Sequence, residues 1–397
     1  MKDKVVLAFS GGLDTSYCAI YLTKELNLDV HSVIVNTGGF PKQEVDEIAS
    51  RASKLGLSQH VTLDETINFY NKCLRYLIFG NILKNNTYPL SVSAERVFQA
   101  MSIVNYAKKI GAKYIAHGST GAGNDQIRFD LMFQVLAPEI EIITPIRDKK
   151  LSRKEEVDYL QQHGIDWEWK KAQYSINKGL WGTSVGGVET LTSNEPLPED
   201  AFPSQLTKEG QERITIGFEK GEPVSLNGKK NDPVEIIKEI ERIAAPFAIG
   251  RDVHVGDTII GIKGRVGFEA AAPLILIKSH HLLEKHTLTK WQQYWKEQLG
   301  NWYGMLLHEG QYLDPVMRNI EMFLEDAQKN VTGEVYVKLM PYRFELEGIK
   351  SSNDLMASKF GQYGEQNLAW TGEDAKGFTK ILANQLKIYH QIHGNND

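Results

Sequence analysis

The chain has 397 residues, of which 42% are hydrophobic and 24% charged, and its net charge is −5. This length predicts two or three domains, and the absence of any apolar run of about 18 residues argues against a membrane-spanning protein. The apolar run near the amino terminus is too short for a signal peptide, Cys18 and Cys73 lack disulfide or zinc-site spacing, and no dense Lys/Arg block indicates nucleic-acid binding. We therefore expect a cytoplasmic protein.

The first part of the chain, from residue 4 to about 165, alternates short apolar strands with helical patterns. This alternation is typical of a parallel sheet covered by helices on both faces. The expected strands are Val5–Phe9, Val30–Val35, His60–Leu63, Tyr114–His117 and Ile140–Thr144. The fold class is therefore α/β, with a Rossmann-like amino-terminal domain.

The middle of the chain has a different pattern. Residues Ser175 to Gln205 are rich in glycine and predict a long irregular loop, which is followed by a hairpin at 212–229 and a helix beginning at Asp232 and Pro233. Further strands are expected at Leu274–Lys278, Glu334–Leu339 and Arg343–Glu347. These elements predict an α+β domain with an antiparallel sheet.

Two apolar helix faces follow. The face formed by Leu288, Trp291, Trp295 and Leu299 has helical spacing and predicts a core stripe. Near the end, Thr371 and Asp374 form a capping box, and an apolar face then continues to the last turn. That face runs through Phe378, Ile381, Leu382, Leu386, Tyr389 and Ile392. It packs either on a neighbouring subunit or on its own chain.

The turn SGGLDTS, at Ser10–Ser16, joins the first strand to the first helix. Its glycines let successive N–H groups face one point, and the helix start adds a positive partial charge, so the turn predicts a phosphate site. It lacks the lysine of GxxxxGK[ST] and the spacing of GxGxxG. We therefore expect it to hold pyrophosphate with Mg²⁺, with Asp14 as the candidate metal ligand. An ordinary capped turn is the alternative.

A second constellation, YIAHGSTGAGNDQIRFD at 114–130, also follows a predicted strand. Asn124, Asp125 and Arg128 fall on one face of the helix that starts there. An amino acid has both a carboxylate and an ammonium group, and Arg128 and Asp125 offer a partner for each. The alternative is an inconsequential surface ion pair.

SGGLDTS alone resembles the pyrophosphate-loop ATPases, which cleave ATP between the α- and β-phosphates. Together with TYPLSVS, HGSTGAGNDQIRFD and YSINKGLWGTS, it resembles argininosuccinate synthase over essentially the whole chain. The resemblance implies a ligase that condenses citrulline with aspartate, uses MgATP and releases AMP and pyrophosphate in arginine biosynthesis. It also implies a cytoplasmic homotetramer with a nucleotide-binding domain (1–168), a synthetase domain (169–362) and an oligomerisation helix (363–397).

The resemblance assigns site residues by position. The ATP-binding residues would be Ala8, Phe9, Ser10, Gly11, Gly12, Leu13, Asp14, Thr15, Ser16, Val35 and Gly118. Aspartate would be bound by Thr120, Asn124 and Asp125, and citrulline by Tyr88, Ser93, Asn124, Arg128, Ser175 and Ser184. Asp14, Asp125 and Arg128 would act in catalysis through positioning and charge.

Three positions depart from the family pattern. Ala122 stands where the family has a lysine, Gly256 where it has a citrulline-binding glutamate, and Phe268 where it has a tyrosine. The loss of the glutamate leaves open a citrulline whose α-amino group is acylated. Two further alternatives are a non-catalytic ATP-binding regulatory module, which would not explain Asn124, Asp125 and Arg128, and a tRNA sulfur-transfer enzyme, which would need a cysteine pair and a basic face. An amidotransferase would need a glutaminase domain, for which the chain offers no Cys/His candidate site.

Overall fold

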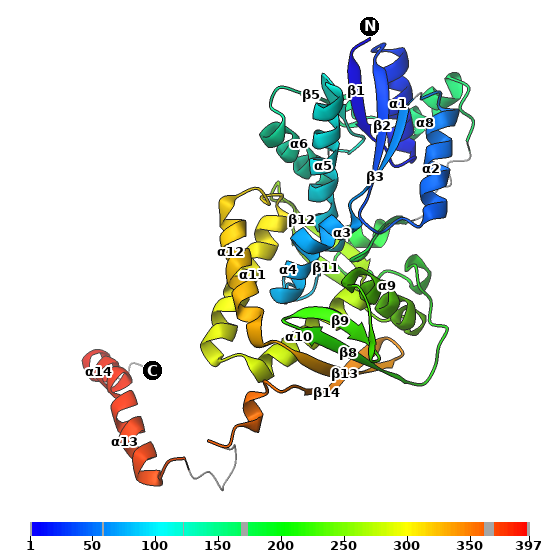
Figure 1. Cartoon of the computed structure of the whole chain (residues 1–397). Coiled ribbons are helices and arrows are strands. Elements are labelled where there is room, and N and C mark those ends of the chain that lie inside the picture. The colour runs from blue at the N-terminus through cyan, green and yellow to red at the C-terminus, as the bar shows by residue number, and fades with distance from the viewer. Residues whose placement is uncertain (1, 58, 122, 168–173, 361–368, 395–397) are drawn as a thin grey trace.

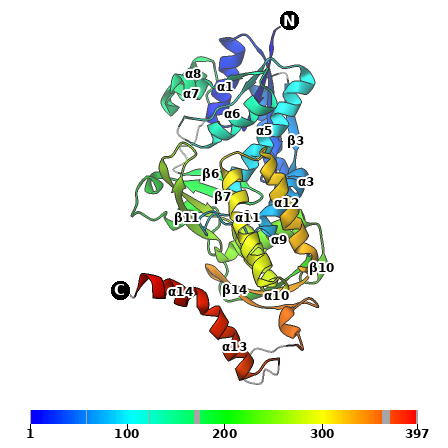
Figure 2. The same ribbon diagram turned by 90° about the vertical axis from the view of Figure 1, so that its left-hand side faces the viewer.

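The computed structural model describes residues 2–57, 59–121, 123–167, 174–360 and 369–394. A parallel sheet with its helices forms one end of the molecule, and two antiparallel sheets with their helices form the middle (Figure 1). The two carboxy-terminal helices stand apart from both, as the turned view in Figure 2 confirms. Among these residues no helix is long and apolar enough to cross a membrane.

The amino-terminal sheet is parallel and has the order β3-β2-β1-β4-β5. All five expected strands are confirmed, and no end is shifted by more than one residue. The strands are β1 (Lys4–Ala8), β2 (Asp29–Asn36), β3 (Gln59–Asp64), β4 (Tyr114–Ala116) and β5 (Glu141–Ile143). The helices are α1 (Leu13–Lys24), α2 (Lys42–Lys54), α5 (Ser91–Ile110), α6 (Asp125–Leu136), α7 (Pro145–Lys149) and α8 (Arg153–Gln162).

A helical excursion between β3 and α5 packs into the second half of the molecule. It consists of α3 (Thr66–Phe69), a π-helical turn η1 (Tyr70–Leu74) and α4 (Arg75–Phe79). The Tyr76 hydroxyl donates to Glu325 at 2.6 Å, and Lys296 donates to the carbonyl of Phe79 at 2.6 Å. One hydrophobic core therefore includes side chains from both halves of the sequence.

The middle of the chain has two antiparallel sheets, where one antiparallel sheet was expected. One has the order β11-β12-β7-β6 and the other β10-β9-β8-β13-β14. The strands of the first are β6 (Ser175–Gly179), β7 (Gly182–Gly186), β11 (Arg251–Asp257) and β12 (Lys263–Glu269). Those of the second are β8 (Glu212–Glu219), β9 (Glu222–Leu226), β10 (Lys229–Lys230), β13 (Gly333–Met340) and β14 (Arg343–Lys350).

Two predictions for this part were wrong. The start of the glycine-rich stretch is the hairpin β6–β7 and not an irregular loop, because Gly182 at φ +104° makes its tight turn. Residues Leu274–Lys278 are not a strand but part of α10 (Ala271–Thr287). A short apolar run in a buried helix cannot be told from a buried strand by periodicity alone.

The remaining helices are α9 (Pro233–Ala244), α11 (Lys290–His308), α12 (Pro315–Ala327), α13 (Gly372–Leu382) and α14 (Asn384–His393). The side chain of Asp232 caps α9, and the predicted capping box of Thr371 and Asp374 starts α13. The core stripe predicted on α11 was wrong, because Trp291 and Trp295 are 64% and 58% exposed.

Candidate active site

The site lies where the order of the parallel sheet reverses, between β1 and β4. In open α/β sheets ligands bind at such a switch point, outside the carboxyl ends of the strands. A cavity of about 1100 Å³ opens there and extends to the hairpin β6–β7 and to β11. Gly118, just after β4, lets the two loops approach: a Cβ atom at this position would lie 3.2 Å from the Asp14 backbone.

The loop after β1 leaves the start of α1 open. Gly12 is the N-cap residue and makes no side-chain capping hydrogen bond, so Ser, Thr or Asp does not cap this helix. Gly11 has φ +70°, and its carbonyl accepts a 2.7 Å hydrogen bond from Arg51 on α2. The free N–H groups of the first turn and the nearby hydroxyls of Ser10 and Thr15, which are 3.3 Å apart, can therefore bind an anion.

Asp14 lines the cavity and is held from behind by α8. Burial and the Asp14 carboxylate raise the pKa of Glu156 to about 8, so Glu156 is protonated at neutral pH and donates a hydrogen bond to Asp14. Glu156 itself is only 3% exposed. This contact holds Asp14 against α8, with its side chain at the cavity wall.

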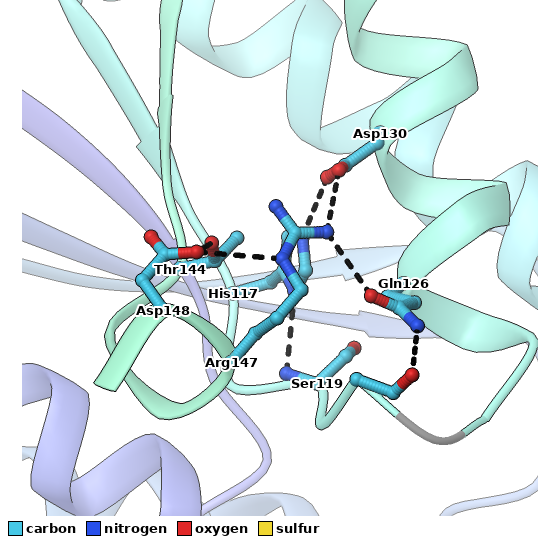
Figure 3. A network of polar contacts seen from close by, with 8 residues as sticks. His117, Ser119, Gln126, Asp130, Thr144, Arg147 and Asp148 are labelled. Carbon is cyan, nitrogen blue, oxygen red and sulfur yellow. Dashed lines mark hydrogen bonds and ion pairs between the residues drawn. The ribbon is translucent and has the colours of Figure 1, made fainter. Parts of the chain in front are cut away.

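The loop after β4 is held by a polar network (Figure 3). The His117 ring accepts from the N–H of Ser119 at 3.2 Å, so its other nitrogen donates to Asp130 at 2.9 Å. Arg147 donates to Asp130 at 2.6 Å and to Gln126 at 3.2 Å. The network joins β4, α6 and α7 around the loop, and it fixes the backbone that carries Gly118 and Thr120.

Asp125, at the start of α6, lies between two arginines. Arg96 donates to one carboxylate oxygen at 2.8 Å and Arg128 to the other at 3.1 Å. Desolvation acts to raise the pKa of Asp125, but the two guanidinium groups outweigh it and lower the pKa. Arg128 also donates two hydrogen bonds to the His308 carbonyl at the end of α11, at 3.0 and 2.8 Å.

The hydrogen bonds that Arg128 already makes limit how it can bind a substrate carboxylate. Its Nε and Nη2 edge is already occupied by the His308 carbonyl, so a substrate carboxylate can use only the remaining N–H groups of Nη1 and Nη2. Asn124 likewise has a structural partner, because its side-chain oxygen accepts from the N–H of Ile259 at 2.9 Å. Both residues therefore connect the first half of the chain to the second.

Most residues assigned by resemblance line this one cavity. On the nucleotide side these are Ala8, Phe9, Ser10, Gly12, Leu13, Asp14, Thr15, Val35 and Gly118, and on the amino-acid side Tyr88, Ser93, Thr120, Asn124, Asp125, Arg128, Ser175 and Ser184. Gly11 and Ser16 do not line it. Ser16 is fully buried, and its hydroxyl has no hydrogen-bond partner.

Further polar residues line the cavity that the sequence did not predict, among them Arg96, His117, His254 and His308. His117 was within the quoted motif, and its place directly after a strand was the available signal. Arg96 carries no such signal, because it is one cation on a long helix. His254 and His308 arrive from β11 and α11, more than a hundred residues away in sequence, and no local pattern predicts them.

The three departures from the family pattern differ in position. Ala122 lies outside the described residues. Gly256 lines the cavity, whereas Phe268 is fully buried and packs its ring 5.4 Å from that of Tyr88. Phe268 thus supports Tyr88 and does not face a ligand.

Glu95 fixes the hairpin β6–β7 to α5. It is 2% exposed, and a Cβ atom at Gly179 would collide with its carboxyl group. Burial raises the pKa of Glu95 to about 8, although Arg96, the Thr37 hydroxyl and the Leu180 N–H act to lower it. A neutral acid at neutral pH therefore anchors the strand that carries Ser175.

Comparison with known proteins gives a consistent result. The family model described as arginosuccinate synthase N-terminal HUP domain matches residues 4–166, and the model of the arginosuccinate synthase C-terminal domain matches residues 174–389. The chain is 37% identical to an argininosuccinate synthase of Dictyoglomus thermophilum, with full coverage of both chains. It is 38% identical to one of Pyrococcus furiosus, over 98% of this chain and 95% of the relative, and 35% identical to one of Xanthomonas campestris, over 99% of both.

The raised pKa of Glu95 predicts how stability depends on pH. Below the ordinary pKa of 4.5 the folded and unfolded states both hold the proton; between 4.5 and about 8 only the folded state holds it. Stability is therefore lost as pH rises through this range, by up to about 1.4 kcal/mol per pH unit. In Glu95→Gln, which keeps a neutral side chain, urea unfolding should show a smaller loss between about pH 5 and 8. Parallel curves for the two proteins would contradict the assignment.

Proposed function

The chain belongs to the argininosuccinate synthase family, and we propose that it catalyses the ATP-dependent condensation of citrulline with aspartate to argininosuccinate, with release of AMP and diphosphate. The observation that carries this proposal is the meeting of two differently built loops in one cavity. The loop after β1 offers an uncapped helix start for phosphates, and the start of α6 offers Asp125 and Arg128 for amino acids. Both line the same wall, with Gly118 at the point of closest approach.

In the first proposed step the ureido oxygen of citrulline attacks the α-phosphorus of ATP. The bond from that phosphorus to the bridging oxygen breaks, and pyrophosphate leaves into the loop at 10–15. The N–H groups of the α1 start and the hydroxyls of Ser10 and Thr15 are placed to stabilise its charge. Because phosphoryl transfer depends mainly on positioning and charge stabilisation, no covalent enzyme intermediate is needed.

In the second step the amine of aspartate attacks the activated ureido carbon. The aspartate ammonium first gives one proton to solvent; the neutral amine then forms the C–N bond, the C–O bond to AMP breaks, and the nitrogen releases a further proton to solvent as the guanidinium forms. Asp125 is suited to bind the aspartate ammonium before this step, because the two arginines keep it ionised. The free N–H groups of Arg128 are suited to bind a substrate carboxylate. We assign Thr120 and Asn124 to aspartate, and Tyr88, Ser93, Asn124, Arg128, Ser175 and Ser184 to citrulline.

Magnesium fits the nucleotide end of this cavity. Asp14 presents a carboxylate there, which is the oxygen ligand that Mg²⁺ prefers, and Mg²⁺ commonly takes only one or two carboxylates besides phosphate oxygens and water. The described residues contain no group of three His, Cys, Asp or Glu side chains placed to hold a metal ion. When bound, the ion would supply positive charge to the phosphates in place of a lysine.

We further propose that the protein works as a cytoplasmic homotetramer, with the domain division at about 168/169 and 362/363. Its exposed apolar faces support self-association. Phe378, Ile381 and Ile392 on α13 and α14 are 64%, 71% and 73% exposed, and Trp291 and Trp295 on α11 are also exposed. Faces of this kind are buried in oligomers of soluble proteins.

The function is tested by pyrophosphate release. The purified protein with MgATP should release pyrophosphate continuously only when both a citrulline acceptor and aspartate are present, and AMP should appear in equal amount. Release that needs neither amino acid would contradict the proposal, and ATP binding without turnover would favour a regulatory module.

Substitution of Asp14 distinguishes a catalytic role of this residue from a structural one. Asp14→Ala should lower kcat in this assay by roughly 100-fold or more, because the carboxylate proposed to hold Mg²⁺ at the phosphates is lost. Its melting temperature should stay close to that of the native protein, since Asp14 does not cap α1. Asp46→Ala, the same substitution at an exposed position on α2, serves as the control. Equal losses of activity and thermal stability would assign Asp14 to folding.

A further inference from the structure

Two histidines form the cavity wall beside Arg128. His254 lies on β11 and His308 at the end of α11, and both line the cavity although they are only 6% and 5% exposed. The Nδ1 atom of each ring is enclosed by protein without a hydrogen-bond partner, so contact with a ligand falls to Nε2. Neither imidazole makes a side-chain hydrogen bond within the described part of the chain, so the Nε2 atoms are available to a ligand with complementary polar groups.

Both imidazoles are uncharged at neutral pH. Burial lowers the pKa of His254, with a smaller effect from Lys84, and burial lowers the pKa of His308 to about 3, with help from Arg128 and Lys84. A neutral imidazole accepts a hydrogen bond at one nitrogen and donates at the other. The wall therefore presents neutral acceptors and donors, flanked by the cations Arg128 and Lys84.

Among the described residues, the carboxylates nearest this wall are Asp257, Asp125 and Glu95, which line the cavity, and Glu309, which acts on Lys84 but does not line the cavity. Asp257 lines the cavity but forms a 2.6 Å ion pair with Lys263, and its side chain is 60% exposed. Asp125 is bound by two arginines and is assigned above to the ammonium group of aspartate, and burial raises the pKa of Glu95 to about 8, so its carboxyl group is neutral. A second ammonium group placed at this wall would meet the cations Arg128 and Lys84, and the cavity-lining carboxylates near it would already be engaged.

Gly256 and His254 share the same space. A Cβ atom at Gly256 would lie 2.6 Å from Nε2 of His254, so a larger residue at 256 requires this ring to move. The ring is held in place by stacking on Tyr88, at a centroid distance of 5.2 Å and an interplanar angle of 26°. The imidazole of His254 thus occupies the room that a side chain at position 256 would take.

From this arrangement we propose that the acceptor is a citrulline whose α-amino group carries an acyl group, and that His254 and His308 determine this specificity. The inference rests on the condensation proposed above and narrows its acceptor. The amide N–H of an acylated substrate can donate to one imidazole, and the acyl carbonyl can accept from the other. The α-ammonium of free citrulline would lack a free carboxylate partner at this wall. It would also be repelled by Arg128 and Lys84.

The test compares citrulline, N-acetylcitrulline and N-succinylcitrulline in the pyrophosphate-release assay. We expect kcat/KM to be at least tenfold higher for an acylated acceptor than for citrulline. Equal or better turnover of free citrulline overturns this inference and leaves the proposed function intact. If none of the three supports turnover, the proposed function itself fails.

The same assay distinguishes the two acyl chemistries through Lys84, a half-buried cation near this wall on which Glu309 and Asp257 act from a distance. A preference for the succinyl compound that Lys84→Met lowers at least tenfold, as the ratio of its kcat/KM to that of the acetyl compound, identifies an anionic acyl group. A preference for the acetyl compound identifies a neutral one. Each result supports acylation.

Substitutions at His254 and Gly256 test whether this wall determines the preference for an acylated acceptor. The double variant His254→Ala, Gly256→Glu makes room for a carboxylate and should shift the kcat/KM ratio at least tenfold toward free citrulline. Val255→Glu is the matched control, because Val255 is the neighbour on the same strand and is 51% exposed, and it should leave the ratio unchanged. If the double variant does not fold, His254→Asn should lower kcat/KM for acylated acceptors more than for citrulline. An unchanged ratio in the folded variants would overturn the assignment.

Discussion

The hydrogen-bonded cluster of Arg96, Asp125 and Arg128 is the interaction on which the rest of the site depends. Asp125 accepts from both arginines, and Arg128 donates in turn to the last carbonyl of α11. The cluster therefore joins α5 and α6 of the amino-terminal part to a helix of the second part. A charged group used in this way stays ionised in a cavity that would otherwise favour its neutral form, because its partners outweigh desolvation. The hydrogen bonds that join the two halves of the chain therefore also keep the Asp125 carboxylate ionised.

The two ends of the cavity are lined by different kinds of polar group. At the end proposed for the nucleotide, the N–H groups at the start of α1 and the hydroxyls of Ser10 and Thr15 are suited to bind phosphate without a lysine, and Glu156 lies against Asp14. At the opposite end, the wall is formed by buried imidazoles and a guanidinium group, and the nearby carboxylates Asp125 and Asp257 are paired with cations. Gly118 lies between them and sets how closely the loops approach. The chemistry proposed for the site needs this arrangement, because one substrate must reach the α-phosphate while remaining bound at its far end.

The sequence predicted the local features well and the distant ones poorly. The five parallel strands, the turn at Ser10–Ser16 and the face with Asn124, Asp125 and Arg128 follow from short patterns, and they lie as expected. The strand expected at Leu274–Lys278 was wrong because burial on all sides hides helical periodicity. Trp291 and Trp295 were wrongly placed in the core, since helical spacing of apolar residues does not say whether the face is covered. His254 and His308 enter the site only through tertiary packing, which no local motif encodes.

The central claim is that the ureido oxygen of the acceptor attacks the α-phosphorus of ATP. The most direct measurement uses whichever citrulline acceptor supports turnover, labelled with ¹⁸O in its ureido group, and follows the label by mass spectrometry. The account predicts one ¹⁸O atom in the phosphate of each AMP released and none in pyrophosphate. Unlabelled AMP, or label in pyrophosphate, would contradict it.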